Sequence, residues 1–105
     1  MKTPPQTTIQ LFNGNQALAI KFVEKCKEEF PKQIMKMAEA IQSESLNDIA
    51  DLTHSFKGQL SYLGAEHLVT LAASLDQVPD HSDWYSYKAN AEALINGINQ
   101  LLTEL

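Results

Sequence analysis

Apolar and polar residues follow a helical spacing along four long stretches of the chain. Apolar side chains recur every three or four residues over residues 16–42, 46–63, 65–77 and 84–105, so each stretch predicts a helix with one apolar face. Pro31 interrupts the first stretch and predicts either a kink or two abutting helices. No stretch alternates with the period of a β-strand. The pattern therefore predicts an all-α fold, an antiparallel four-helix bundle with a short N-terminal extension.

The segments outside these helices are short. Residues 1–8 contain two prolines and little apolar surface, which predicts a flexible tail ahead of a helical domain at 9–105. Residues 78–83 form a predicted loop before the last helix. The residues with a predicted role at helix ends or contacts are Asn15 as an N-cap, Gly64 as a left-handed C-cap, Ser82 or Asp83 as the last N-cap, and Gly97 as a point of close helix packing.

Composition narrows the classes of function open to this 105-residue chain. Eight Lys and Arg stand against 13 Asp and Glu, so the net charge is 8 − 13 = −5, with a pI near 5.0. An acidic chain without a basic run argues against binding to nucleic acid or to an anionic membrane surface. No apolar run is long enough for a membrane span, and residues 1–10 lack the apolar core of a signal peptide. We therefore expect a cytoplasmic protein without direct membrane insertion.

One histidine of the second predicted helix is placed away from the core. On a wheel of about 100° per residue, His54 lies roughly 120° from the centre of the apolar face. Lys57 and Gly58, three and four residues on, stand beside it. The positive charge of Lys57 disfavours the protonated imidazolium, which keeps a nitrogen lone pair available as a nucleophile. Glycine is unfavourable inside a helix by about 1 kcal/mol, so Gly58 predicts a surface that a partner approaches closely.

The sequence around this histidine resembles the signature of histidine-containing phosphotransfer (HPt) domains. The signature has the form H-x-x-K-G-x-x-x-x-[apolar]-G-A, and the run from Thr53 to Ala65 meets its fixed positions. The resemblance extends over about residues 10–105. The chain departs from the common pattern at Thr53, Gln59 and Tyr62, and the bulk of Tyr62 is expected to alter the docking surface. The residues that match the fixed positions are His54, Lys57, Gly58, Leu63, Gly64 and Ala65.

The resemblance implies a phosphorelay intermediate. His54 would accept a phosphoryl group from the aspartyl phosphate of a receiver domain and pass it to another receiver, while Lys57 would offset charge on the transferring group. The receiver would supply Mg²⁺, so the chain would need no cofactor or metal and would show no autokinase activity. The remaining implied roles are docking of the receiver at Gly58 and Ser61, orientation of the second His54 nitrogen by Asp76 or Gln77, and helix termination at Gly64 and Ala65.

The implied partners are the receiver domains of response regulators and a hybrid sensor histidine kinase, with this chain as a monomer. The chain is also compatible with the C-terminal domain of a membrane-bound hybrid kinase. A second hypothesis is a non-catalytic helical module that binds a receiver without phosphotransfer. A third is the histidine domain of a chemotaxis-type kinase, although these 105 residues contain no kinase domain.

Other chemistry-bearing residues have simpler interpretations. His54, His67, His81 and Cys26 have no spacing typical of a zinc site, so we expect no metal centre. Cys26 lies on an apolar face and is expected to be a small core residue. Asp48 and Asp51 precede His54 in the same helix, where acidic side chains near the N-terminus favour the helix dipole.

Overall fold

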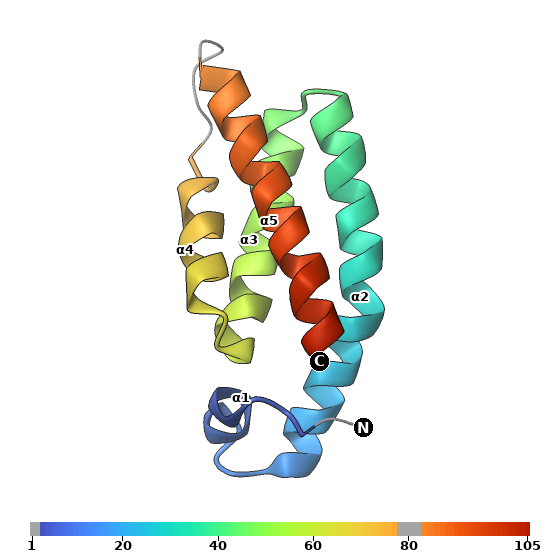
Figure 1. Ribbon diagram of the computed structural model, residues 1–105, viewed down its shortest axis with the longest axis vertical. Coiled ribbons are helices and arrows are strands. Elements are labelled where there is room, and N and C mark those ends of the chain that lie inside the picture. Colours follow the sequence, from blue (N-terminus) through green and yellow to red (C-terminus); the bar gives the residue numbers. More distant parts are fainter. Residues whose placement is uncertain (1–2, 78–82) are drawn as a thin grey trace.

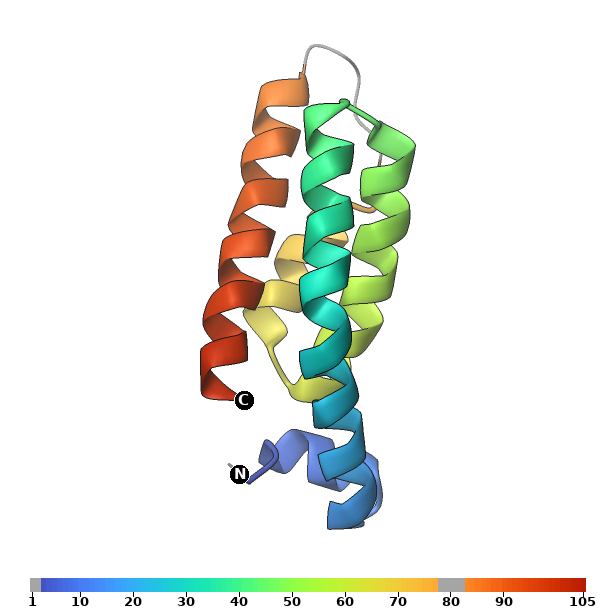
Figure 2. The same cartoon turned by 90° about the vertical axis from the view of Figure 1, so that its right-hand side faces the viewer.

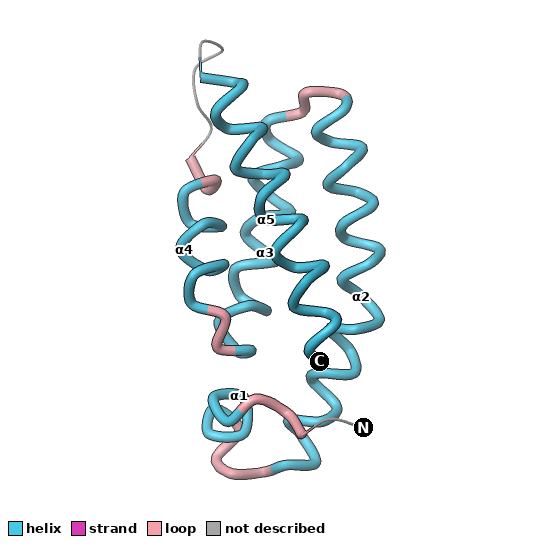
Figure 3. The backbone as a smooth tube through the Cα atoms, viewed as in Figure 1, coloured by secondary structure: helices cyan, strands magenta, loops and turns pink. Residues whose placement is uncertain are grey.

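A computed structural model describes residues 3–77 and 83–105, and this part of the chain is helical throughout apart from its connections (Figures 1 and 3). A short helix comes first and four longer helices follow. In chain order they are α1 (Gln6–Leu11), α2 (Gln16–Gln42), α3 (Leu46–Leu63), α4 (Glu66–Ser74) and α5 (Trp84–Glu104).

The four longer helices form an elongated antiparallel bundle. Helices α2 and α3 run side by side in opposite directions, α4 packs against α3, and α5 closes the bundle against α4 and α2 (Figures 1 and 2). Helix α1 lies across the end of the bundle, against α3 and the start of α2. The principal extents are 46 × 20 × 18 Å. The predicted all-α bundle with a short N-terminal extension is confirmed.

The core contains the residues of the predicted apolar faces. Phe30 of α2 and Phe56 of α3 are both fully buried, with their ring centroids 5.9 Å apart. Thr53 is also buried, and its hydroxyl donates to the Ile49 carbonyl one turn earlier, which satisfies its polar group. The other fully buried large side chains include Met37, Ile49, Leu60, Leu75, Leu94 and Ile98.

Two predicted helix ends are confirmed in detail. The Asn15 side chain accepts the backbone N–H of Leu18 at 3.1 Å and caps α2. Gly64 ends α3 with φ +73°, a left-handed conformation that favours glycine. Asp83 occupies the N-cap position of α5 but its side chain forms no capping hydrogen bond. The predicted loop at 78–82, including Ser82 and His81, lies outside the described residues.

The structure decides between the two alternatives at Pro31. Helix α2 continues through this residue, so the alternative of two abutting helices is wrong. Pro31 and Lys27, one turn earlier, are both exposed, so water can solvate the Lys27 carbonyl that proline leaves without its usual donor.

Helix α4 is shorter than the pattern predicts, because it ends at Ser74 rather than near Gln77. The N–H groups of Leu75 and Asp76 donate to the carbonyls three residues before them, which tightens the final turn. The Tyr87 hydroxyl of α5 donates to the Leu75 carbonyl at 2.7 Å and holds this end in place.

The N-terminal segment differs from the prediction. Helix α1 begins at Gln6, inside the segment for which a tail is predicted, and Thr8 is fully buried. The Thr8 hydroxyl donates at 2.7 Å to the Tyr62 carbonyl, at the end of α3 where helix carbonyls need a donor. Phe12 follows α1 and packs against the rings of Phe22 and Tyr62 at centroid distances of 5.7 Å.

None of the described helices is both long and apolar enough to cross a membrane.

Candidate functional site

His54 lies in the middle of α3 with its side chain exposed. The flanking residues Thr53 and Phe56 are fully buried, so the backbone that carries the imidazole is anchored in the core. In residues 3–77 and 83–105, no group forms a hydrogen bond with this imidazole. The side chain is therefore presented to solvent by a rigid helix, as the wheel predicts.

Lys57, one turn further along α3, forms an ion pair with Asp76, which follows the end of α4. Its ammonium Nζ donates to Oδ2 of Asp76 at 2.8 Å, and the two side chains are 37% and 27% exposed. The Lys57 charge next to His54 is thus partly offset by the Asp76 carboxylate.

Neither of the two residues predicted to orient His54 forms a hydrogen bond with its imidazole in the described part of the chain. Asp76 directs its carboxylate to Lys57 instead, since the final turn of α4 holds it opposite that side chain. Gln77 is exposed beyond the end of α4, and no hydrogen bond from it to His54 occurs in the described part of the chain.

Small residues follow His54 along the exposed face of α3. Gly58 is exposed, and a Cβ built at this position would meet no atom within 4 Å. Ser61, one turn later, is exposed as well. The face next to the imidazole is therefore open, and packing within the molecule does not explain why position 58 is glycine.

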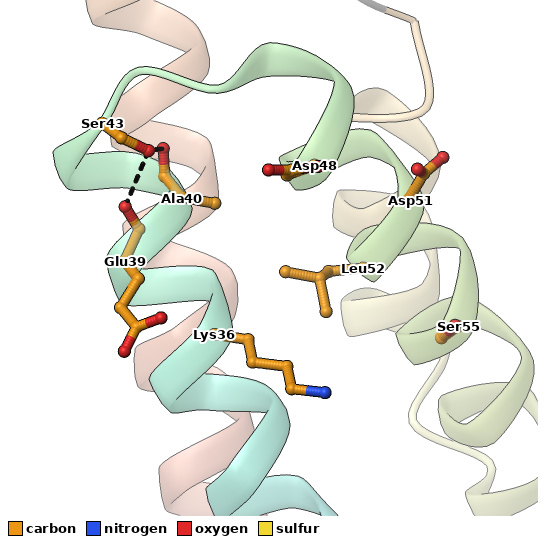
Figure 4. A pocket seen from close by; sticks show the side chains of 8 residues that line it. All are labelled: Lys36, Glu39, Ala40, Ser43, Asp48, Asp51, Leu52 and Ser55. Atoms are coloured by element: carbon orange, nitrogen blue, oxygen red, sulfur yellow. Dashed lines mark hydrogen bonds between the residues drawn. The ribbon is translucent and has the colours of Figure 1, made fainter.

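A groove of about 490 Å³ lies between α2 and α3, alongside the turn that precedes His54 (Figure 4). Lys36 of α2 and Leu52 of α3 extend into it from opposite sides, while Asp51 points away from α2. The groove is open and mixed in charge, and its lining residues are Lys36, Glu39, Ala40, Ser43, Asp48, Asp51, Leu52 and Ser55.

Polar and aromatic side chains continue this α2–α3 face toward α1. Gln59 of α3 accepts from the Gln33 amide at 3.0 Å and donates to Glu29 at 3.5 Å, so it bridges to α2. Tyr62 follows, 44% exposed, with its ring 5.5 Å from that of Phe22. Gln59 and Tyr62 depart from the common motif, but the motif does not indicate their partners in α2, which are 26 to 40 residues away in the sequence.

In the part of the chain that the structure describes, none of the remaining candidates forms a hydrogen bond or an ion pair with His54. Burial raises the pKa of the Cys26 thiol to about 12, with Glu29 adding to the effect, so it is a protonated core residue. His67 is exposed at the start of α4, and Asp48 and Asp51 are exposed in the first turns of α3. His81 lies outside the described residues.

The comparisons with known proteins identify the class. The profile of the Hpt domain family matches residues 21–105, which is most of the chain. The chain therefore belongs to the Hpt domain family, whose members carry out histidine phosphotransfer in phosphorelays and interact with the receiver domains of response regulators. Searches of curated proteins and of solved structures found no significant match.

Proposed function

We propose that His54 is the phosphoacceptor and that the chain passes a phosphoryl group from one receiver domain to another. The observation that carries this proposal is the exposed imidazole at the centre of α3, with Lys57 and the open face of Gly58 beside it, inside the family match. The imidazole is the one side chain of the motif that can act as a nucleophile at neutral pH.

The transfer balances as a single in-line displacement. The lone pair of His54 Nε2 forms a bond to phosphorus while the bond from phosphorus to the receiver's aspartate oxygen breaks. The departing carboxylate keeps the electron pair, and the ring retains its proton on Nδ1. Passage to the second receiver is the reverse reaction on another aspartate, and neither step needs an oxidant or any reactant besides the receiver.

The residues around His54 have separate roles in this proposal. Lys57 offsets charge on the transferring phosphoryl group, and Gly58 and Ser61 let the receiver approach the imidazole. The receiver supplies Mg²⁺, because its acidic cluster carries the aspartate that is phosphorylated. In this proposal the chain is a cytoplasmic monomer that acts between a hybrid sensor kinase and a response regulator.

The test is phosphoryl uptake from a phosphorylated receiver in the presence of Mg²⁺. A His54→Gln variant should lose uptake entirely, because glutamine has no comparable nucleophile. His67→Gln is the matched control, since it removes an equally exposed histidine at the start of α4 and should leave uptake unchanged.

Uptake that persists in His54→Gln would contradict the proposal. A receiver that binds the wild type without any phosphohistidine forming would instead favour a non-catalytic interaction module.

A further inference from the structure

The ion pair between Lys57 and Asp76 links α3, one turn from His54, to the segment that follows α4. The 2.8 Å separation of Nζ and Oδ2 is that of a charge-assisted hydrogen bond, and both side chains are partly buried. The link joins residues 19 apart in the sequence. Its position matters because Lys57 is also the cation proposed to contact the phosphoryl group.

The backbone at Asp76, just after α4, is held in place through its own N–H and through the neighbouring Leu75. The preceding residue, Leu75, is fully buried, and its carbonyl accepts the Tyr87 hydroxyl of α5 at 2.7 Å. The Asp76 N–H donates to the Ala73 carbonyl at 3.3 Å. The pKa of Tyr87 is raised, chiefly by burial and secondly by the nearby Asp76 charge. The partly exposed carboxylate is therefore held at the edge of the bundle, against Lys57 and near Tyr87.

We propose that Asp76 is a positioning residue that competes with the phosphoryl group for the Lys57 ammonium and so lowers the share of phosphoryl group held on His54. The inference rests on the proposed function of His54. In the unphosphorylated protein the carboxylate holds the ammonium one turn from the imidazole. In the phosphorylated protein the same ammonium faces two anions, which repel each other. This competition favours release of the phosphoryl group to a receiver.

The test is the equilibrium constant for phosphoryl exchange between a receiver and this chain, measured for the wild type and for Asp76→Asn. The amide keeps the size of the side chain but removes its charge. The share of phosphorylated His54 should rise by roughly threefold to tenfold, the size expected for coupling within an ion-pair network. Asp83→Asn, an exposed acid at the start of α5, controls for the change in net charge and should have no effect.

A double-mutant cycle separates positioning from a structural role. In a Lys57→Met background, Asp76→Asn should no longer shift the equilibrium, because the shared cation is absent. An equal shift of the equilibrium in both backgrounds, or no shift in either, would overturn the inference. Phosphoryl transfer by the wild type would still support the proposed function in that case. If wild-type His54 takes up no phosphoryl group, the proposed function and the inference fail together.

Discussion

Two glycines inside helices have opposite surroundings: one faces open space, and the other is in close contact with a neighbouring helix. At Gly58 a Cβ would meet only open space. At Gly97 of α5 a Cβ would overlap the Leu68 side chain of α4, which is only 2% exposed. The prediction of close packing at Gly97 is confirmed, and the helix contact accounts for that glycine within the molecule.

Alanine at these two positions should therefore change stability in opposite directions. Gly58→Ala should raise the free energy of unfolding by about 0.5–1 kcal/mol, because alanine is the better helix former. Gly97→Ala should lower it by about 1 kcal/mol, since overpacking exceeds the same gain in helix propensity. Urea unfolding of both variants measures the difference, and equal effects would show that Leu68 moves aside freely.

The buried thiol of Cys26 gives stability a pH dependence at alkaline pH. Its folded pKa of about 12 exceeds the ordinary value of 9.0, and that of Tyr87 is also raised. Above about pH 9 the unfolded chain loses the Cys26 proton while the folded chain keeps it, so stability falls as pH rises. In urea unfolding at several values between about pH 8 and pH 10.5, Cys26→Ala should show a shallower fall than the wild type. Parallel profiles would contradict the assignment.

The exposure of the candidate site residues could be predicted from their spacing, but their contacts could not. Helical periodicity placed His54 and Gly58 on one exposed side of the helix, with Lys57 between His54 and the apolar face, because relative directions along a single helix depend only on residue number. The partner of Lys57 depends on where α4 ends and on the hydrogen bond from Tyr87 that holds that end. Such contacts between helices are tertiary, and the apolar spacing does not determine how far one helix is shifted along its neighbour.

At the scale of elements, α1 is the helix that the pattern did not predict. It has six residues and no capping side chain, and it is too short to show a repeated apolar spacing. Isolated helices of this length are unstable in water, so its order depends on the contacts of Thr8 and Phe12 with α2 and α3. The longer helices were predictable because each repeats its apolar spacing over several turns.

Removing the Thr8 hydroxyl should destabilise the protein measurably. Thr8→Val keeps the shape of the side chain but leaves the Tyr62 carbonyl without its donor, which should lower the free energy of unfolding by about 1–2 kcal/mol. Thr7→Val is the matched control at an exposed neighbour and should stay within about 0.5 kcal/mol of the wild type. Chemical unfolding measures both, and a Thr8→Val variant as stable as Thr7→Val would show that this hydrogen bond is dispensable.

At the scale of the whole molecule, the bundle follows from four amphipathic helices joined by short connections. Each helix must bury one face, and short connections place consecutive helices antiparallel. Length and composition argue against a nucleic-acid binder and a membrane-spanning protein, but they do not predict the shape of the molecule. Its extents of 46 × 20 × 18 Å depend on how far α2 projects beyond the other helices to meet α1. That projection could not be predicted without knowing that α1 is ordered.

Under the proposed function, the position of His54 along this narrow bundle determines whether two receivers can bind at the same time. The residue is the ninth of the 18 in α3, about 12 Å from either end of that helix. A standard interface of about 800 Å² per partner is roughly 30 Å across and would extend over most of that flank. Donor and acceptor would then exclude one another, so relay through His54 would be a shuttle in which one receiver leaves before the next arrives. An excess of unphosphorylated acceptor would slow loading by the donor, so the ratio of the two receivers in the cell would set the flow of signal.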